Sequence, residues 1–256
     1  MAVTQQTVDC SDFDVTLPGE GSPAFRVLVP ERVIADGYEA APLHTIRGTW
    51  ERNFGLVGGR FIHEHTLEIT VLLMPGERDL RISLTIMNIG ETPLDRLRAD
   101  ICSAVNHLPG EPGWANAEFM PDTPLDRNAQ GAYWYETVTP KGMTILTTGG
   151  DWHSIHPHPD RPSAASVPPY GFEISHEPVA TACAVHPHGD ESSWFFQAWD
   201  HPGHTCTPFP GNACMHLHPV IADRLEPGAS ATVHGVTGLF SGSRDALARH
   251  IGDSLA

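Results

Sequence analysis

Two neighbouring stretches of alternating apolar and polar residues constrain the fold more than any other feature of this sequence. Residues 60–74 read RFIHEHTLEITVLLM, and residues 80–87 read LRISLTIM. Successive side chains of a β-strand point to opposite faces of its sheet, so each alternation predicts a strand with one buried face. The Pro75-Gly76-Glu77 sequence between them predicts a turn.

Composition extends this prediction to the rest of the chain. Glycine and proline number 24 and 23 among 256 residues, which favours many short strands and turns over long helices. Ser243 is a good N-cap for the one convincing helix, over about residues 244–250. We find no internal repeat and no credible linker. The sequence therefore predicts an all-β fold, a single large antiparallel β-sandwich domain over residues 1–256 with one short C-terminal helix.

The net charge and the cysteine pattern limit the classes of partner and the cellular compartment that we expect. The formal net charge of −16 argues against nucleic acid and anionic membranes, because both require basic patches. No signal peptide is evident, and no apolar stretch approaches the length that spans a membrane. The five cysteines include no CxxC pair, which predicts a reducing cytoplasm. Cys206 and Cys214 flank a Pro/Gly turn, so one bridge or a metal role there stays open.

Aromatic rings, imidazoles and tight turns are concentrated in residues 194–219, WFFQAWDHPGHTCTPFPGNACMHLHP. Residues two apart on a strand share a face, so we expect Gln197 and Trp199 to point the same way. Such a stretch lines a pocket with polar groups and flat apolar walls. We expect Gln197 and Trp199 to contact a substrate there.

Several segments, taken in chain order, resemble the galactose mutarotase-like family, the aldose 1-epimerases. Residues 80–94, LRISLTIMNIGETPL, are similar to that family's strand–turn–strand hairpin, and Asn106-His107 follows where the family has an Asn-His. His201-Pro-Gly-His204 then precedes a Leu225-Glu-Pro-Gly228 turn and a last strand. The resemblance covers roughly residues 60–240 and implies a β-supersandwich and a sugar substrate. The family's glutamate base has no match in register, so the resemblance implies fold and substrate class more than the epimerase reaction.

Histidine supplies the candidates for acid/base chemistry, because imidazole titrates near neutral pH. His107 is expected at a strand end before a tight Gly/Pro loop. His201 and His204 form a compact polar turn with Asp200, whose carboxylate can fix the tautomer of a neighbouring imidazole. We therefore predict His107, Asp200, His201 and His204 as catalytic residues, with surface or loop-bonding histidines as the alternative.

Flat aromatic side chains suit the apolar faces of sugar rings. Trp152 and its neighbour His153 lie in the longest predicted loop, residues 149–170, and are expected to contact substrate together with Trp199. Arg60, at the start of a strand, is expected either to bind a carboxylate or hydroxyl groups or to be a surface charge.

Two His-x-His pairs stand in expected strands, His63-Glu64-His65 and His216-Leu217-His218. On a strand each pair projects to one side, which suits two ligands of one metal ion. His216 and His218 are the preferred metal candidates, for zinc, iron, nickel or manganese. The alternative for each pair is a polar strand face.

These observations favour an enzyme that acts on a sugar or sugar-like small molecule by histidine acid/base chemistry, as an epimerase (isomerase) or a β-eliminating lyase without a required cofactor. Two other classes stay open: a metal-dependent enzyme with a histidine-rich site, and a non-catalytic carbohydrate-binding protein. The sequence does not determine the oligomeric state.

Overall fold

The computed structural model describes residues 1–5, 11–19, 24–40, 48–53, 56–105, 133–139, 142–147, 172–173, 180–187, 192–207 and 214–256. Within these ranges His204, Cys206 and His216 are placed by their backbones alone. The predicted site residues His107, Trp152 and His153 lie outside the described residues and stay predictions.

The described residues form sixteen β-strands and a C-terminal α-helix. The strands are β1 (Ala2–Gln5), β2 (Asp12–Thr16), β3 (Phe25–Ala35), β4 (Tyr38–Ala40), β5 (Gly48–Asn53), β6 (Leu56–His63), β7 (Leu67–Pro75), β8 (Asp79–Asn88), β9 (Leu94–Val105), β10 (Tyr133–Thr139), β11 (Gly142–Thr147), β12 (Phe172–Glu173), β13 (Ala180–Pro187), β14 (Ser193–Thr207), β15 (Cys214–Leu225) and β16 (Ser230–Ser241). The helix is α2 (Arg244–Leu255).

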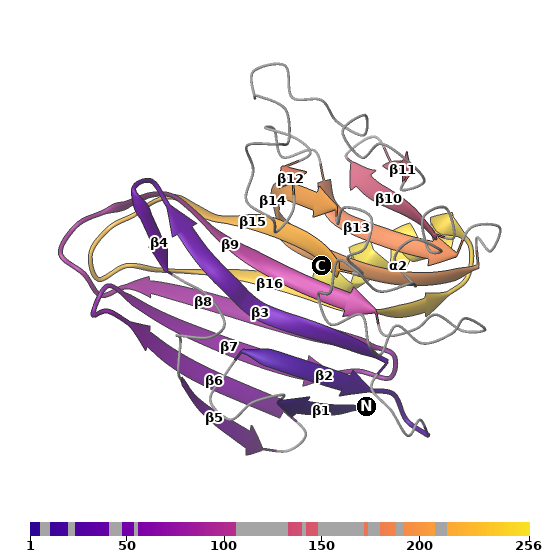
Figure 1. Cartoon of the computed structure of the whole chain (residues 1–256), viewed down its shortest axis with the longest axis horizontal. Helices are drawn as coiled ribbons and strands as arrows, with labels where there is room; N and C mark the ends of the chain where they lie inside the picture. The colour runs from indigo at the N-terminus through magenta and orange to yellow at the C-terminus, as the bar shows by residue number, and fades with distance from the viewer. Residues whose placement is uncertain are drawn as a thin grey trace, which may run out of the picture.

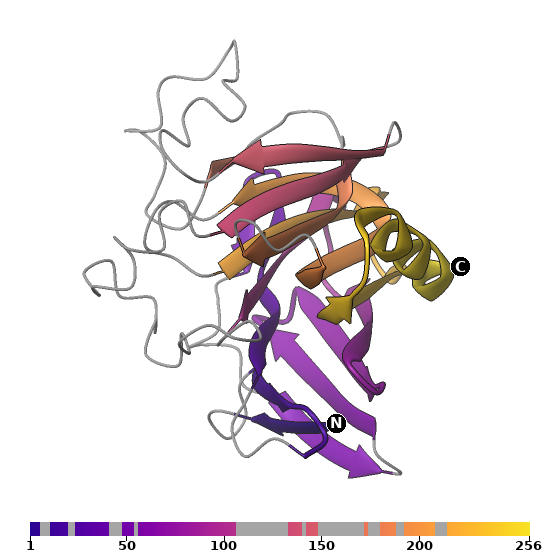
Figure 2. The same cartoon turned by 90° about the vertical axis from the view of Figure 1, so that its right-hand side faces the viewer.

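Antiparallel pairing joins the strands in the order β1-β2-β3-β9-β15-β14-β16-β8-β7-β6-β5, and this array folds over into two facing layers (Figures 1 and 2). Aromatic contacts cross between the layers. The ring of Phe13 on β2 lies 4.4 Å from that of Trp50 on β5, and Phe25 on β3 lies 5.5 Å from Phe195 on β14. The predicted all-β antiparallel sandwich is confirmed.

Strand β14 passes from one layer to the other. Its first half pairs with β16, from Ser193↔Ser241 to Trp199↔Gly235. Its second half pairs with β15, from Gly203↔Pro219 to Cys206↔His216. A strand that changes layers in this way makes a corner of a β-sandwich. The histidine-rich stretch of the sequence therefore lies at the corner that joins the two layers.

The first alternating stretch forms two strands, β6 and β7, with a turn at residues 64–66 between them, whereas the second forms β8 as predicted. On β7 the side chains of Leu67, Ile69, Val71 and Leu73 are buried in the core between the layers, and the residues between them are more exposed. The His63-Glu64-His65 prediction is wrong, however. Glu64 and His65 have φ values of 45° and 57° and form the turn after β6, so the two histidines do not share a strand face.

Helix α2 covers the outer face of β14 and β16. Its Leu247 and Ile251 pack with Trp194, Phe196 and Val236 in a second, smaller apolar cluster. Ser243 caps the helix as predicted: its Oγ accepts a hydrogen bond from the Ala246 N–H at 3.3 Å. Among the described helical residues, no segment is long and apolar enough to cross a membrane.

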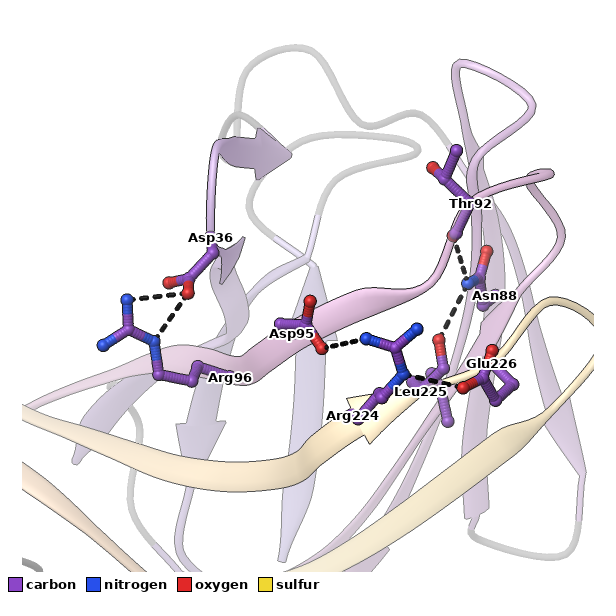
Figure 3. Close-up of polar contacts among 8 residues, drawn as sticks. All are labelled: Asp36, Asn88, Thr92, Asp95, Arg96, Arg224, Leu225 and Glu226. Atoms are coloured by element: carbon purple, nitrogen blue, oxygen red, sulfur yellow. Dashed lines mark hydrogen bonds and ion pairs between the residues drawn. The ribbon is translucent and has the colours of Figure 1, made fainter.

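One end of the sandwich is held by Asn88, in a region that we call the Asn88 turn (Asn88, Gly90, Thr92 and Leu225). Figure 3 shows Asn88, Thr92 and Leu225 of this turn. Asn88 is fully buried, and its Nδ2 donates to the carbonyl oxygens of Thr92 and Leu225 at 2.9 and 3.0 Å. Its Oδ1 accepts from the Gly90 N–H at 3.0 Å. The asparagine of the predicted hairpin thus links the β8–β9 turn to the end of β15.

Candidate functional site

A row of three polar side chains crosses adjacent strands of the first layer. Arg32 lies on β3, Asp100 on β9 and His218 on β15, and these strands lie side by side (Figure 1). We call these three residues the polar row. On β9, Ala99 and Ile101 point into the core between the layers, so Asp100 points to the opposite face. The row therefore lies on the face of this layer that turns away from the core.

Asp100 is the centre of the row and is fully buried. Its Oδ2 accepts a hydrogen bond from Arg32 Nε at 2.8 Å, while its Oδ1 lies 3.1 Å from His218 Nε2. The Arg32 side chain is 23% exposed and the His218 side chain 7%. A buried carboxylate requires a partner charge, and Arg32 supplies it.

The imidazole of His218 is buried but incompletely satisfied. Its Nε2 is close to Asp100 but not aligned for a hydrogen bond, and among the described residues neither Nε2 nor Nδ1 has a hydrogen-bond partner. Most buried polar atoms in proteins are paired. An unpaired buried imidazole beside a carboxylate is therefore a candidate for binding or proton transfer.

An irregularity in β3 places Arg32 opposite Asp100. The register between β3 and β9 shifts between Leu28 and Arg32, so β3 is locally longer than its partner. Ser11, which directly precedes β2, stabilises this bulge through two hydrogen bonds. Its Oγ donates to the Pro30 carbonyl at 2.9 Å, and its carbonyl accepts from the Val29 N–H at 3.0 Å. These two hydrogen bonds hold the backbone just before Arg32.

The row continues in register onto β14. His204 of β14 is paired directly with His218 of β15, and two residues along the same ladder Cys206 is paired with His216. His216 is also paired with Cys102 of β9. The predicted catalytic residue His204 and the predicted metal ligands His216 and His218 therefore occupy adjacent positions of one ladder.

Asp200 and His201 lie at the bend of β14, and their side chains are in contact. Asp200 Oδ1 lies 2.9 Å from His201 Nδ1 and also accepts a hydrogen bond from the His234 N–H at 2.9 Å. The His201 side chain is 46% exposed. The carboxylate thus holds an accessible imidazole in one orientation, which is the arrangement that acid/base use requires.

Gln197 and Trp199 share a face, as expected, but it is the face buried between the layers. They are 0% and 1% exposed. Gln197 Nε2 donates to the Ile101 carbonyl at 3.3 Å, and the Trp199 ring packs so closely on Gly235 that a Cβ there would lie 2.7 Å from it. Because neither side chain reaches a surface here, this placement differs from the expected substrate contacts.

Arg60 forms a two-point ion pair on the exposed surface. Its Nε and Nη2 donate to the carboxylate of Glu68 at 2.8 and 2.6 Å. The hydrogen bond with Glu68 raises the pKa of Arg60, and the same bond lowers the pKa of Glu68. The structure therefore places Arg60 as a paired surface charge, the second of the two expectations for it.

Sequence reasoning missed Arg32 and Asp100. The available signal was a charged residue within an otherwise apolar segment, at Asp100 in ADICSAV. Its partner Arg32 lies far away in the sequence and is brought to it by the β3 bulge.

Among the described side chains, no group of three or more potential metal ligands converges. The polar row itself offers one imidazole and one carboxylate that is already paired with Arg32. Its chemistry is that of an oriented imidazole next to a fixed negative charge, which can accept or donate a proton.

The sequence matches no described protein family and no curated protein. Among solved structures, the α-N-acetylgalactosaminidase NagBb of Bifidobacterium bifidum, in complex with GalNAc, has a TM-score of 0.50 at 10% identity over 99% of this chain and 39% of that chain. A galactose mutarotase-like protein of Lactobacillus casei has a TM-score of 0.44 at 11% identity, over 82% and 80% of the two chains. The GalM/aldose epimerase homologue of C. elegans has 0.43 at 10%, over 83% and 78%. At these identities the comparison with the galactosaminidase shows a shared fold alone.

Proposed function

We propose that the protein is a carbohydrate-active enzyme that moves a proton on a sugar or sugar-like small molecule, by epimerisation or β-elimination. The observation that carries the proposal is the polar row, in which a buried carboxylate lies between a guanidinium and an imidazole. Buried titratable groups of this kind are characteristic of functional sites.

Each member of the polar row has a part in this proposal. Arg32 supplies the opposite charge next to the buried Asp100 carboxylate. The Asp100 charge next to Nε2 favours an imidazole with its proton on that nitrogen, so that Nδ1 is the basic atom. His218 would then take a proton from a sugar carbon or hydroxyl through Nδ1 and return it there.

A second proton-transferring group is needed at the other face of the sugar, and the chain offers several. Asp200 and His201 form an oriented, accessible pair. His204 is paired in register with His218, and His107 stays a prediction from the sequence. Trp152 and His153 stay the proposed sugar contacts.

The fold shared with an α-N-acetylgalactosaminidase supports a sugar as substrate. On its cysteine pattern, we still expect a cytoplasmic protein.

The test is a panel of aldoses and uronic acids, followed by NMR for exchange at sugar carbons and by ultraviolet absorbance for the double bond that β-elimination creates. His218→Gln keeps a polar side chain near Asp100 but cannot shuttle protons. We expect it to lower turnover by about 10²–10⁴-fold. His234→Ala, at an exposed histidine of β16, is the matched control and should keep wild-type turnover.

Wild-type turnover in folded His218→Gln protein would rule out this assignment. Saturable sugar binding without turnover by the wild type would instead favour a non-catalytic carbohydrate-binding protein. Circular dichroism of each variant separates a loss of chemistry from a loss of fold.

A further inference from the structure

Four residues of metal-binding type occupy a square of backbone positions where β14 joins β15. His204 is paired with His218, and Cys206 is paired with His216. Directly paired residues of antiparallel strands lie on the same face with Cα atoms about 4.5–5.5 Å apart. Residues two apart on one strand are about 6.6–6.8 Å apart on that face. The ladder therefore brings all four positions within the reach of imidazole and thiolate ligands around one ion.

At one of these four positions the structure describes the side chain, and that side chain has an unsatisfied hydrogen-bonding atom. His218 is 6% exposed, and among the described residues its Nδ1 has no hydrogen-bond partner. Its Nε2 faces Asp100 at 3.1 Å. Most buried polar atoms in proteins are paired, so the Nδ1 nitrogen leaves a place for a polar group next to it.

We propose that the other three corners, His204, Cys206 and His216, bind a divalent ion of the zinc type. Two imidazoles and one thiolate are borderline-to-soft ligands, which suits zinc and does not suit magnesium, calcium or manganese. Three protein ligands leave one coordination position open. A water molecule or a sugar hydroxyl in that position would supply the hydrogen bond that His218 Nδ1 lacks.

The assignment makes His204 a ligand, which removes it from the candidates for the second proton-transferring group, and leaves His218 as the proton carrier. Asp100 stays beside His218, which completes the square without being a ligand. The proposal goes beyond the proposed function, because ion binding is measured without any substrate. It also refines the sequence prediction, in which His216 and His218 were the two ligands.

The test uses untagged full-length protein, stripped with a chelator and titrated with zinc or with cobalt(II) as a coloured probe. We expect about one ion per chain by elemental analysis after dialysis, a thiolate-to-cobalt absorption band, and a rise in Tm with zinc concentration. His216→Ala and Cys206→Ser should lose stoichiometric binding, and Cys206→Ser should lose the thiolate band. His218→Gln should keep the ion while it loses sugar turnover.

Control variants keep the test decisive. His234→Ala should bind like the wild type, and circular dichroism confirms that each variant is folded. No stoichiometric uptake by the wild type, or uptake unchanged in His216→Ala and Cys206→Ser, would overturn the site. Loss of the ion in folded His218→Gln would overturn the separation of ligand from proton carrier. Ion binding without turnover on any sugar would contradict the proposed function and leave the metal site standing.

Discussion

The Asn88 turn and the polar row are both buried polar regions of one β-sandwich, but they differ in how completely their atoms are paired. Every side-chain polar atom of Asn88 has a partner, and its backbone N–H and carbonyl bond to Ala229 and Gly228. In the polar row, Asp100 is paired with Arg32, whereas among the described residues His218 has no hydrogen bond at either nitrogen. The Asn88 turn is thus satisfied within the chain, whereas the His218 imidazole keeps hydrogen-bonding capacity beside a buried carboxylate.

Among the variants that test this difference between the two regions, Arg32→Ala should have the largest effect on stability. It leaves Asp100 buried without its guanidinium, and removing one partner of a buried ion pair costs about 3–5 kcal/mol. We expect a decrease of about 3 kcal/mol in the free energy of unfolding, measured with urea. The double variant Arg32→Ala/Asp100→Asn should recover part of that loss, because no buried carboxylate then lacks its guanidinium. A single variant as stable as the wild type would show that Arg32 does not support Asp100.

Asn88→Ala tests the fully paired region. It removes three hydrogen bonds from a buried site and leaves the Thr92 and Leu225 carbonyls without their donor, so we expect a loss of about 2 kcal/mol. Turnover per folded molecule should not change. By contrast, His218→Gln should change stability by less than about 1 kcal/mol, since neither nitrogen that it removes makes a hydrogen bond to a described residue. The reverse order of these two effects would contradict the comparison.

The smallest effect is expected at the exposed Arg60–Glu68 pair. The hydrogen bond from Arg60 lowers the pKa of Glu68 below its ordinary value of 4.5. The pair's contribution is therefore fully present above pH 4.5 and is lost as the pH falls through the folded-state pKa. The stability difference between the wild type and Arg60→Ala, measured with urea between pH 3 and 7 (roughly the range that carboxylates titrate), should shrink on acidification. A difference that grows at low pH would refute this origin.

Local patterns in the sequence predicted local structure well. Alternation predicted β structure over residues 60–74 and 80–87, where β6, β7 and β8 lie, and Ser243 predicted the start of α2. Alternation failed at His63-Glu64-His65, because two positive φ angles turn the chain there. It also placed Gln197 and Trp199 on one face without revealing that this face is the buried one. Which face is covered depends on the other layer, and no local pattern encodes it.

The site depended on long-range register, which sequence patterns do not contain. Arg32 meets Asp100 only because β3 bulges, and His204 meets His218 only through the β14–β15 ladder. The sequence did indicate the right kinds of residue in 201–218. It did not indicate that β9 would contribute the buried carboxylate.

The late position of β15 and β16 in the chain has a consequence for how the protein is made. Strand β8 completes its ladder only with β16, as in Leu84↔Val233, and β9 pairs with β15, as in Ile101↔Leu217. While the ribosome synthesises the intervening segment, β8 and β9 each have one edge whose backbone N–H and C=O groups are unpaired. Such edges are sites of aggregation until their partner strands have been made. Such long-range pairing also slows folding. We therefore expect the nascent chain to depend on chaperones until β15 and β16 have emerged.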